Sequence, residues 1–167
     1  MTPGQPATLD AGRAALVRWL ADRQVVDATA TVVDNGSGLS RAERITPGAL
    51  AAVLEIAWNG PYGAELASSL PVPGVDGTLK RRYRDAPIAG RAHLKSGYLE
   101  NVRAIAGYVH GPGGRTLIVV GIVNHDRARE AAGVPEALVQ WTLDQIDRPD
   151  CCDGMQPAAG RRGARSR

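Results

Sequence analysis

The chain contains no phenylalanine, and tryptophan and tyrosine together contribute only 4% of its 167 residues. A core without phenylalanine has to be built from Ala, Val, Leu and Ile with three Trp, which leaves little surplus stability. No apolar run approaches the length of a membrane-spanning helix. Residues 1–6 have neither a basic start nor an apolar stretch, so no secretory signal peptide is predicted. The composition, 44% hydrophobic and 22% charged, argues against disorder along the whole length.

Cysteine is nearly absent. The sequence has two, Cys151 and Cys152, and they are adjacent. Adjacent cysteines rarely bridge each other without strain, and a metal site needs more ligands than this pair. Two incidental thiols are therefore a simpler interpretation than a metal or redox pair. His93, His110 and His125 are scattered without ligand spacing. We expect no metal and no cofactor, and we find none of the glycine-rich motifs that cradle phosphates.

A basic excess is absent from most of the chain, although the formal net charge is +3. Residues 148–167 hold five Arg against two Asp, which is +3, so residues 1–147 are neutral. A neutral body is not the electrostatic footprint of a nucleic-acid-binding protein. We therefore expect residues 1–147 to form the folded part and residues 148–167 to form a disordered basic tail.

The pattern of apolar residues predicts an α+β fold with an antiparallel sheet flanked by helices. Capping residues and helical spacing predict helices over 8–23, 46–58 and 135–146. Residues 70–77 read as part of a long loop, and the basic residues 80–84 read as a solvated face. Strands are predicted over the ranges 28–33, 92–96, 102–109 and 116–123. The last of these is a continuous apolar run, which is typical of a strand covered on both faces.

One short motif, Lys95-Ser96-Gly97, follows a predicted strand, and K-[ST]-G alone is a weak signal. Its context is more specific. Upstream lie D-N-G-S-G-L-S-R at 34–41 and L-P-V-P-G-V-D-G-T-L at 70–79, and A-G-Y follows at 106–108. In this order the blocks resemble the C-terminal part of D-alanyl-D-alanine carboxypeptidases of the penicillin-binding protein 4 type, peptidase family S13. The resemblance covers roughly residues 4–146, with Asn35 inserted and Ser96 in place of Thr.

The resemblance implies part of a serine β-lactamase or penicillin-binding-protein transpeptidase-like fold, acting on peptidoglycan peptides that end in D-Ala-D-Ala. It implies that Lys95 supplies positive charge and that Ser96 binds the substrate carboxylate. Gly97 would let substrate approach the strand, and the backbone N–H of Tyr98 would be an oxyanion donor. The resemblance also makes Arg82 a candidate substrate-binding residue. The full-length relative would be periplasmic and would bind β-lactams.

Two of the three catalytic motifs of that family are missing from this sequence. S-x-x-K needs Ser three residues before Lys, but Gly77 precedes Lys80 and Ala92 precedes Lys95 at that spacing. No Ser has Asn two residues later, so S-x-N is absent too. We therefore expect a C-terminal fragment that is inactive alone, and cytoplasmic if it is made without a signal peptide.

The alternative is a non-catalytic module that binds peptidoglycan peptides or complements a separately encoded N-terminal half. Carboxypeptidase and endopeptidase cleavage use one site, so the sequence predicts neither preference. The oligomeric state also stays open.

Overall fold

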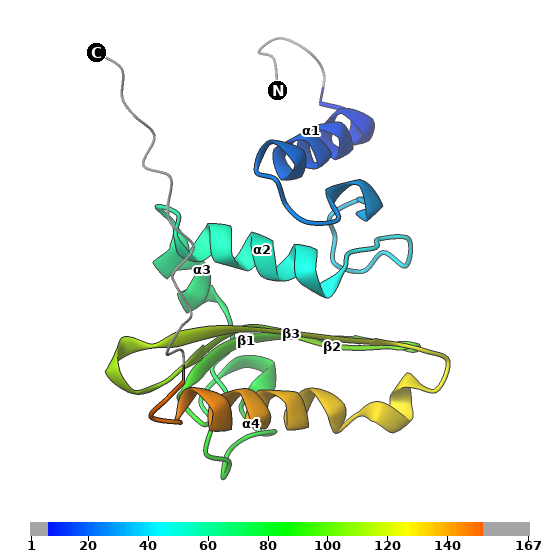
Figure 1. Ribbon diagram of the computed structural model, residues 1–167. Coiled ribbons are helices and arrows are strands. Elements are labelled where there is room, and N and C mark those ends of the chain that lie inside the picture. Colours follow the sequence, from blue (N-terminus) through cyan, green and yellow to red (C-terminus); the bar gives the residue numbers. More distant parts are fainter. Residues whose placement is uncertain (1–6, 152–167) are drawn as a thin grey trace, which may run out of the picture.

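The computed structural model describes residues 7–151, which form layers of helix and sheet (Figure 1). From the top of that view, α1 lies over α2 and α3, these lie over the sheet, and α4 lies below it. The elements are α1 (Leu9–Asp22), α2 (Pro47–Trp58), α3 (Gly63–Ser69), β1 (Ala92–Leu99), β2 (Val102–His110), β3 (Thr116–Asn124) and α4 (Val134–Ile146).

The first two helices begin where their capping residues predict. The hydroxyl of Thr8 accepts a hydrogen bond of 3.1 Å from the N–H of Ala11 at the start of α1. Thr46 does the same for Ala49 at 3.1 Å, with Pro47 at the first position of α2. Both bonds satisfy backbone donors that a helix start otherwise leaves unpaired.

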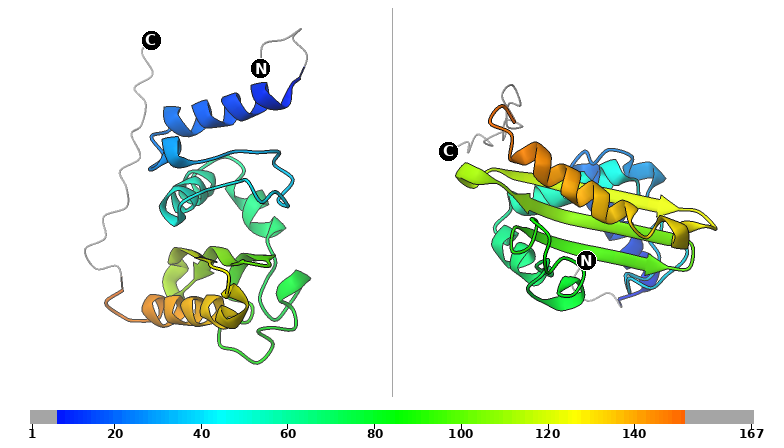
Figure 2. Two further views of the ribbon diagram at one scale, coloured as in Figure 1. Left: turned by 90° about the vertical axis from the view of Figure 1, so that its right-hand side faces the viewer. Right: turned by 90° about the horizontal axis from the view of Figure 1, so that it is seen from below.

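The sheet is antiparallel in the order β1-β2-β3, as the sequence predicts. A two-residue turn joins β1 to β2, since Leu99 pairs with Val102. α2 packs on one face of β3 and α4 on the other, so the apolar run over 116–123 is covered on both faces. Figure 2 (right) shows α4 running across the underside of the sheet.

The main core lies between the sheet and α4. Fully buried members come from β1, β2 and α4, namely Leu94, Ile105, Val109, Val139, Leu143 and Ile146, and β3 contributes Val119, which is 4% exposed. A smaller cluster of Leu20, Val25 and Ala49 joins α1 to α2. Tyr108 connects the layers, because its hydroxyl donates to the backbone oxygen of Leu54 in α2 at 2.8 Å.

Two predictions about local structure are wrong. Residues 28–33 do not form a strand: Ala28–Ala30 is one 3₁₀ turn, and a single bridge pairs Val32 with Arg44. β-branched residues favour a strand only where a neighbouring strand is available, and here a single bridge is all the pairing they find. Helix α3 lies in the predicted long loop, where the hydroxyls of Ser68 and Ser69 donate to backbone oxygens three residues earlier.

The predicted strand over 92–96 is too short. The structure extends it to Leu99 because the tight turn lets every residue of β1 pair with β2. Arg148 to Cys151 form a turn after α4, in which the N–H of Cys151 donates to the oxygen of Arg148 at 3.1 Å. The rest of the predicted tail, 152–167 with Cys152, lies outside the described residues.

Candidate functional site

A groove with a volume of about 880 Å³ runs between the sheet, α2 and the loop before α2. Its apolar lining comes from two sides: Leu50 and Leu54 of α2, and Ala104, Ala106 and Ile122 of the sheet. The rim is polar and includes Ser40, Arg41, Glu43, Arg44, Lys95, Ser96, Glu100 and Asp126. A largely apolar cleft with a few convergent polar groups is the usual form of a small-ligand site.

The strand β1 brings the K-S-G residues to this groove. Ala92 and Leu94 belong to the core that faces α4, so the two-residue period turns Lys95 and Gly97 toward α2. Lys95 is exposed, while Gly97 is half-buried. Lys95, Gly97 and the half-buried Ser96 all line the groove. The Ser96 side chain alternates with the other two toward α4, so Ser96 joins the site at the edge of the strand.

β1 is an edge strand, and its backbone shows which groups face outward. The N–H of Leu94 donates to the oxygen of Pro71 at 2.9 Å, so it points away from β2. Since backbone hydrogen-bonding direction alternates along an antiparallel strand, the N–H groups of Ser96 and Tyr98 point outward too. The Nζ of Lys95 donates to the backbone oxygen of Ser96 at 2.7 Å, which brings the ammonium to the same edge.

Two glycines permit close contact between β1 and β2. A Cβ on Gly97 would lie 3.3 Å from the Cβ of Ala104. Gly107 has φ +147°, and a Cβ there would lie only 2.1 Å from the backbone oxygen of His93. The glycine in the A-G-Y block is therefore required by backbone packing behind the site.

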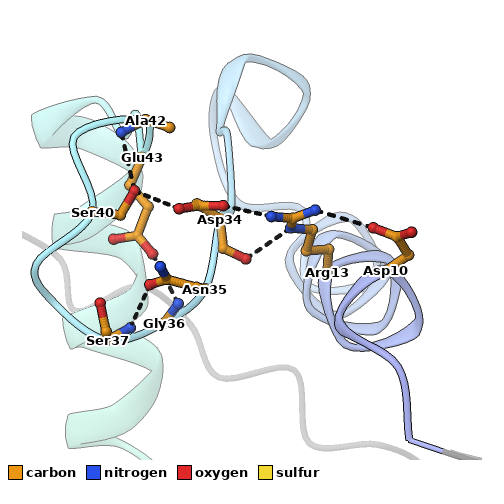
Figure 3. Close-up of polar contacts among 9 residues, drawn as sticks. All are labelled: Asp10, Arg13, Asp34, Asn35, Gly36, Ser37, Ser40, Ala42 and Glu43. Atoms are coloured by element: carbon orange, nitrogen blue, oxygen red, sulfur yellow. Dashed lines mark hydrogen bonds and ion pairs between the residues drawn. The ribbon is translucent and has the colours of Figure 1, made fainter.

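The loop over 34–41 is built around Asp34 (Figure 3). Asp34 accepts hydrogen bonds from Arg13 of α1 at 2.5 Å and from the hydroxyl of Ser40 at 2.6 Å. Gly36 and Gly38 have φ of +66° and +73°, as a tight loop with positive-φ positions predicts. The inserted Asn35 fits because its side chain accepts from the N–H of Ser37 at 3.0 Å.

The charge of Asp34 is favoured by these contacts. The hydrogen bonds from Ser40 and Arg13 hold the pKa of this carboxyl below its ordinary value, against a smaller opposing effect of burial. Arg13 also pairs with Asp10 at 3.0 Å and donates its Nε to the backbone oxygen of Asp34 at 2.8 Å. The loop that forms one rim of the groove is thus fastened to α1.

Arg82 does not line the groove. Its guanidinium forms an ion pair with Glu136 of α4 and lies 5.1 Å from the ring centroid of Tyr98. The Tyr98 side chain projects toward α4, because it alternates with Lys95 and Gly97 along β1. Arg82 is therefore not among the residues that line the groove, and its role in substrate binding stays a prediction. The structure also shows that Arg82 is more buried than a solvated basic run predicts, since its side chain is 25% exposed.

Sequence reasoning missed most of the rim. Glu43, Arg44, Glu100 and Asp126 are ordinary charged residues with no motif around them, so no pattern distinguishes them. Three of them make structural contacts: Glu43 accepts from the N–H of Gly36 at 3.1 Å, Arg44 donates to the backbone oxygen of Arg41 at 2.7 Å, and Glu100 pairs with Arg129 at 3.5 Å.

Two further observations concern residues 7–151. Within that range, no three His, Cys, Asp or Glu side chains are grouped so as to hold a metal ion. None of the helices there is long and apolar enough to cross a membrane.

This arrangement is similar to part of a known penicillin-binding protein. The crystal structure of penicillin binding protein 4 (dacB) from Haemophilus influenzae, complexed with a β-lactam, superposes with a TM-score of 0.68 at 22% identity. The match covers 86% of this chain and 34% of that one. It shows that the helices and the three-stranded sheet form part of that fold.

Sequence comparison gives the family. The model of the D-Ala-D-Ala carboxypeptidase 3 (S13) family matches residues 1–145, and the chain belongs to that family. It is 35% identical over 111 residues to a D-alanyl-D-alanine carboxypeptidase of Actinomadura sp. (strain R39), covering 64% of this chain and 20% of that protein. It is 33% identical over 129 residues to carboxypeptidase DacB of Mycolicibacterium smegmatis, covering 73% and 28%. The chain therefore spans about a quarter of such relatives.

Proposed function

We propose that this chain supplies the K-S-G wall of a serine-type D-Ala-D-Ala carboxypeptidase/endopeptidase site. One observation carries the proposal. The ammonium of Lys95 and the outward N–H groups of Ser96 and Tyr98 meet at the open edge of β1 beside the groove. Positive charge and backbone donors along one strand edge suit an extended peptide that ends in a carboxylate.

The peptide would add to β1 as a further strand. Its terminal carboxylate would be bound by Lys95 and by the hydroxyl of Ser96, and the side chain of the last residue would lie over Gly97. The N–H of Tyr98 would donate to the carbonyl oxygen of the D-Ala-D-Ala peptide bond, where negative charge develops during acyl transfer. Membership of the S13 family supports this substrate class.

The acyl-transfer step itself needs a serine nucleophile with a lysine three residues later, and the 167 residues contain no such pair. The chain alone is therefore a binding wall without a nucleophile, and it forms no acyl-enzyme with peptide or with β-lactam. In a full-length relative the same wall would work in the periplasm, opposite the S-x-x-K and S-x-N motifs.

A complementing module is the second candidate, and β3 favours it. Thr116–Asn124 carries no charged side chain, and within residues 7–151 no strand pairs with its outer edge. Unprotected apolar edge strands are rare in proteins that work alone. A separately encoded N-terminal half that carries the two missing motifs would be the partner.

Labelling with a fluorescent penicillin tests both parts of this proposal. The purified chain alone should give no covalent band after denaturing electrophoresis, and a band on it would contradict its inactivity. A polypeptide carrying S-x-x-K and S-x-N, taken from the Actinomadura relative, should gain label when the chain is added. Equal labelling with Lys95→Met as with the unsubstituted chain would contradict the role of Lys95, and Lys80→Met is the matched control.

A further inference from the structure

Behind the open edge of β1, on the face toward α4, two arginines contact one tyrosine. The Cζ atoms of Arg82 and Arg103 lie 5.1 Å and 4.9 Å from the ring centroid of Tyr98. Both distances fall within the range of cation–π attraction. We call Arg82, Tyr98 and Arg103 the arginine clamp.

Each arginine is also held at its other contacts. Arg103 is 9% exposed, and its Nη1 donates to the backbone oxygens of Leu99 at 2.5 Å and Val102 at 2.8 Å. These two oxygens flank the turn between β1 and β2. Arg82 pairs with Glu136 in α4. The ring of Tyr98 therefore contacts two groups that are fixed to the turn and to α4.

Two polar atoms of the clamp residues and their partners are buried without hydrogen bonds, which lowers the stability of the fold. Within residues 7–151, the Nε of Arg103 and the Oε2 of Glu136 are buried without a hydrogen-bond partner. Unsatisfied buried polar atoms destabilise a fold, and they are uncommon unless another requirement retains them. The residue that gains from the arrangement is Tyr98, which is 50% exposed at the end of an edge strand.

We propose that Arg82 and Arg103 are positioning residues, which hold Tyr98 so that its outward N–H keeps a fixed direction at the end of the K-S-G strand. Strand ends beside a turn and at a sheet edge are places where local opening is easy. The clamp opposes that opening from the rear face, where it does not obstruct the groove. This inference rests on the proposed function, because it concerns the N–H assigned there to the substrate carbonyl.

The aromatic ring of Tyr98, not its hydroxyl, contacts both arginines. Substitutions that keep or remove the ring therefore test the clamp. Tyr98→Phe should keep the clamp, whereas Tyr98→Leu and Arg103→Met should break it. Tyr62→Leu is the matched control, because Tyr62 is 76% exposed and contacts neither arginine. Two readouts are measured on the full chain by NMR: the ¹⁵N–¹H NOE of the Tyr98 amide, and the dissociation constant of N-acetyl-D-Ala-D-Ala.

With Tyr98→Leu we expect a lower NOE at residue 98. We also expect peptide binding to weaken by about fivefold, because two cation–π contacts with the ring are lost. Tyr98→Phe should restore both values while folding as well as the unsubstituted chain. Equal values for Phe and Leu at position 98, or no change in either, would overturn the clamp. An unsubstituted chain that binds no peptide would overturn the proposed function, and the NOE would still decide whether the clamp exists.

Discussion

Among single residues, Asp34 shows how one side chain joins the loop at the groove to α1. Arg13 and Ser40 both donate to its carboxylate, and together they lower its pKa. A carboxyl whose pKa is lowered by folding stabilises the protein above its ordinary pKa of 3.8. That contribution disappears as the pH falls through the still lower pKa of the folded state.

Asp34→Asn should therefore destabilise the chain at pH 7 and have a smaller effect at pH 3. Urea denaturation at the two pH values measures the difference, with Asp22→Asn at the end of α1 as the control. An Asp34→Asn variant as stable as the unsubstituted chain at pH 7 would show that the contacts in Figure 3 add nothing to folding.

Among the helices and strands, the sequence predicts correctly those whose position depends on nearby residues. The starts of α1 and α2 follow from Thr8 and Thr46, and three consecutive strands follow from the late apolar runs. The strand predicted over 28–33 is wrong and α3 is not predicted, because pairing partners and packing, not propensity, decide both segments. The K-S-G residues are recognisable by resemblance, whereas the rim of the groove comes from distant segments that only the fold brings together.

The hairpin of β1 and β2 depends on Gly107, whose φ is +147°. Gly107→Ala should lower the free energy of unfolding by about 3 kcal/mol, because backbone strain adds to a clash with the oxygen of His93. Gly12→Ala, in an open position of α1, should instead raise it by about 1 kcal/mol. Thermal and urea unfolding of both variants measure this, and a neutral Gly107→Ala would mean that β1 and β2 pair differently.

At the scale of the whole molecule, charge agrees with a peptide ligand better than with nucleic acid. Residues 1–147 have no net charge, and the three basic residues that line the groove, Arg41, Arg44 and Lys95, are matched by three acidic ones. A nucleic-acid interface is instead a continuous basic surface. The groove as a whole has no charge excess, so the Lys95 ammonium at the edge of β1 can recognise a single carboxylate locally.

The central claim is that the open edge of β1 recognises the carboxylate end of a D-Ala-D-Ala peptide, and an amide chemical-shift map of the ¹⁵N-labelled chain tests it most directly. Adding N-acetyl-D-Ala-D-Ala should move the amide signals of Ser96, Gly97 and Tyr98 and leave those of α1 in place. Lys95→Met should abolish the shifts, and Lys80→Met should preserve them. Shifts located elsewhere, or unchanged by Lys95→Met, would contradict the account.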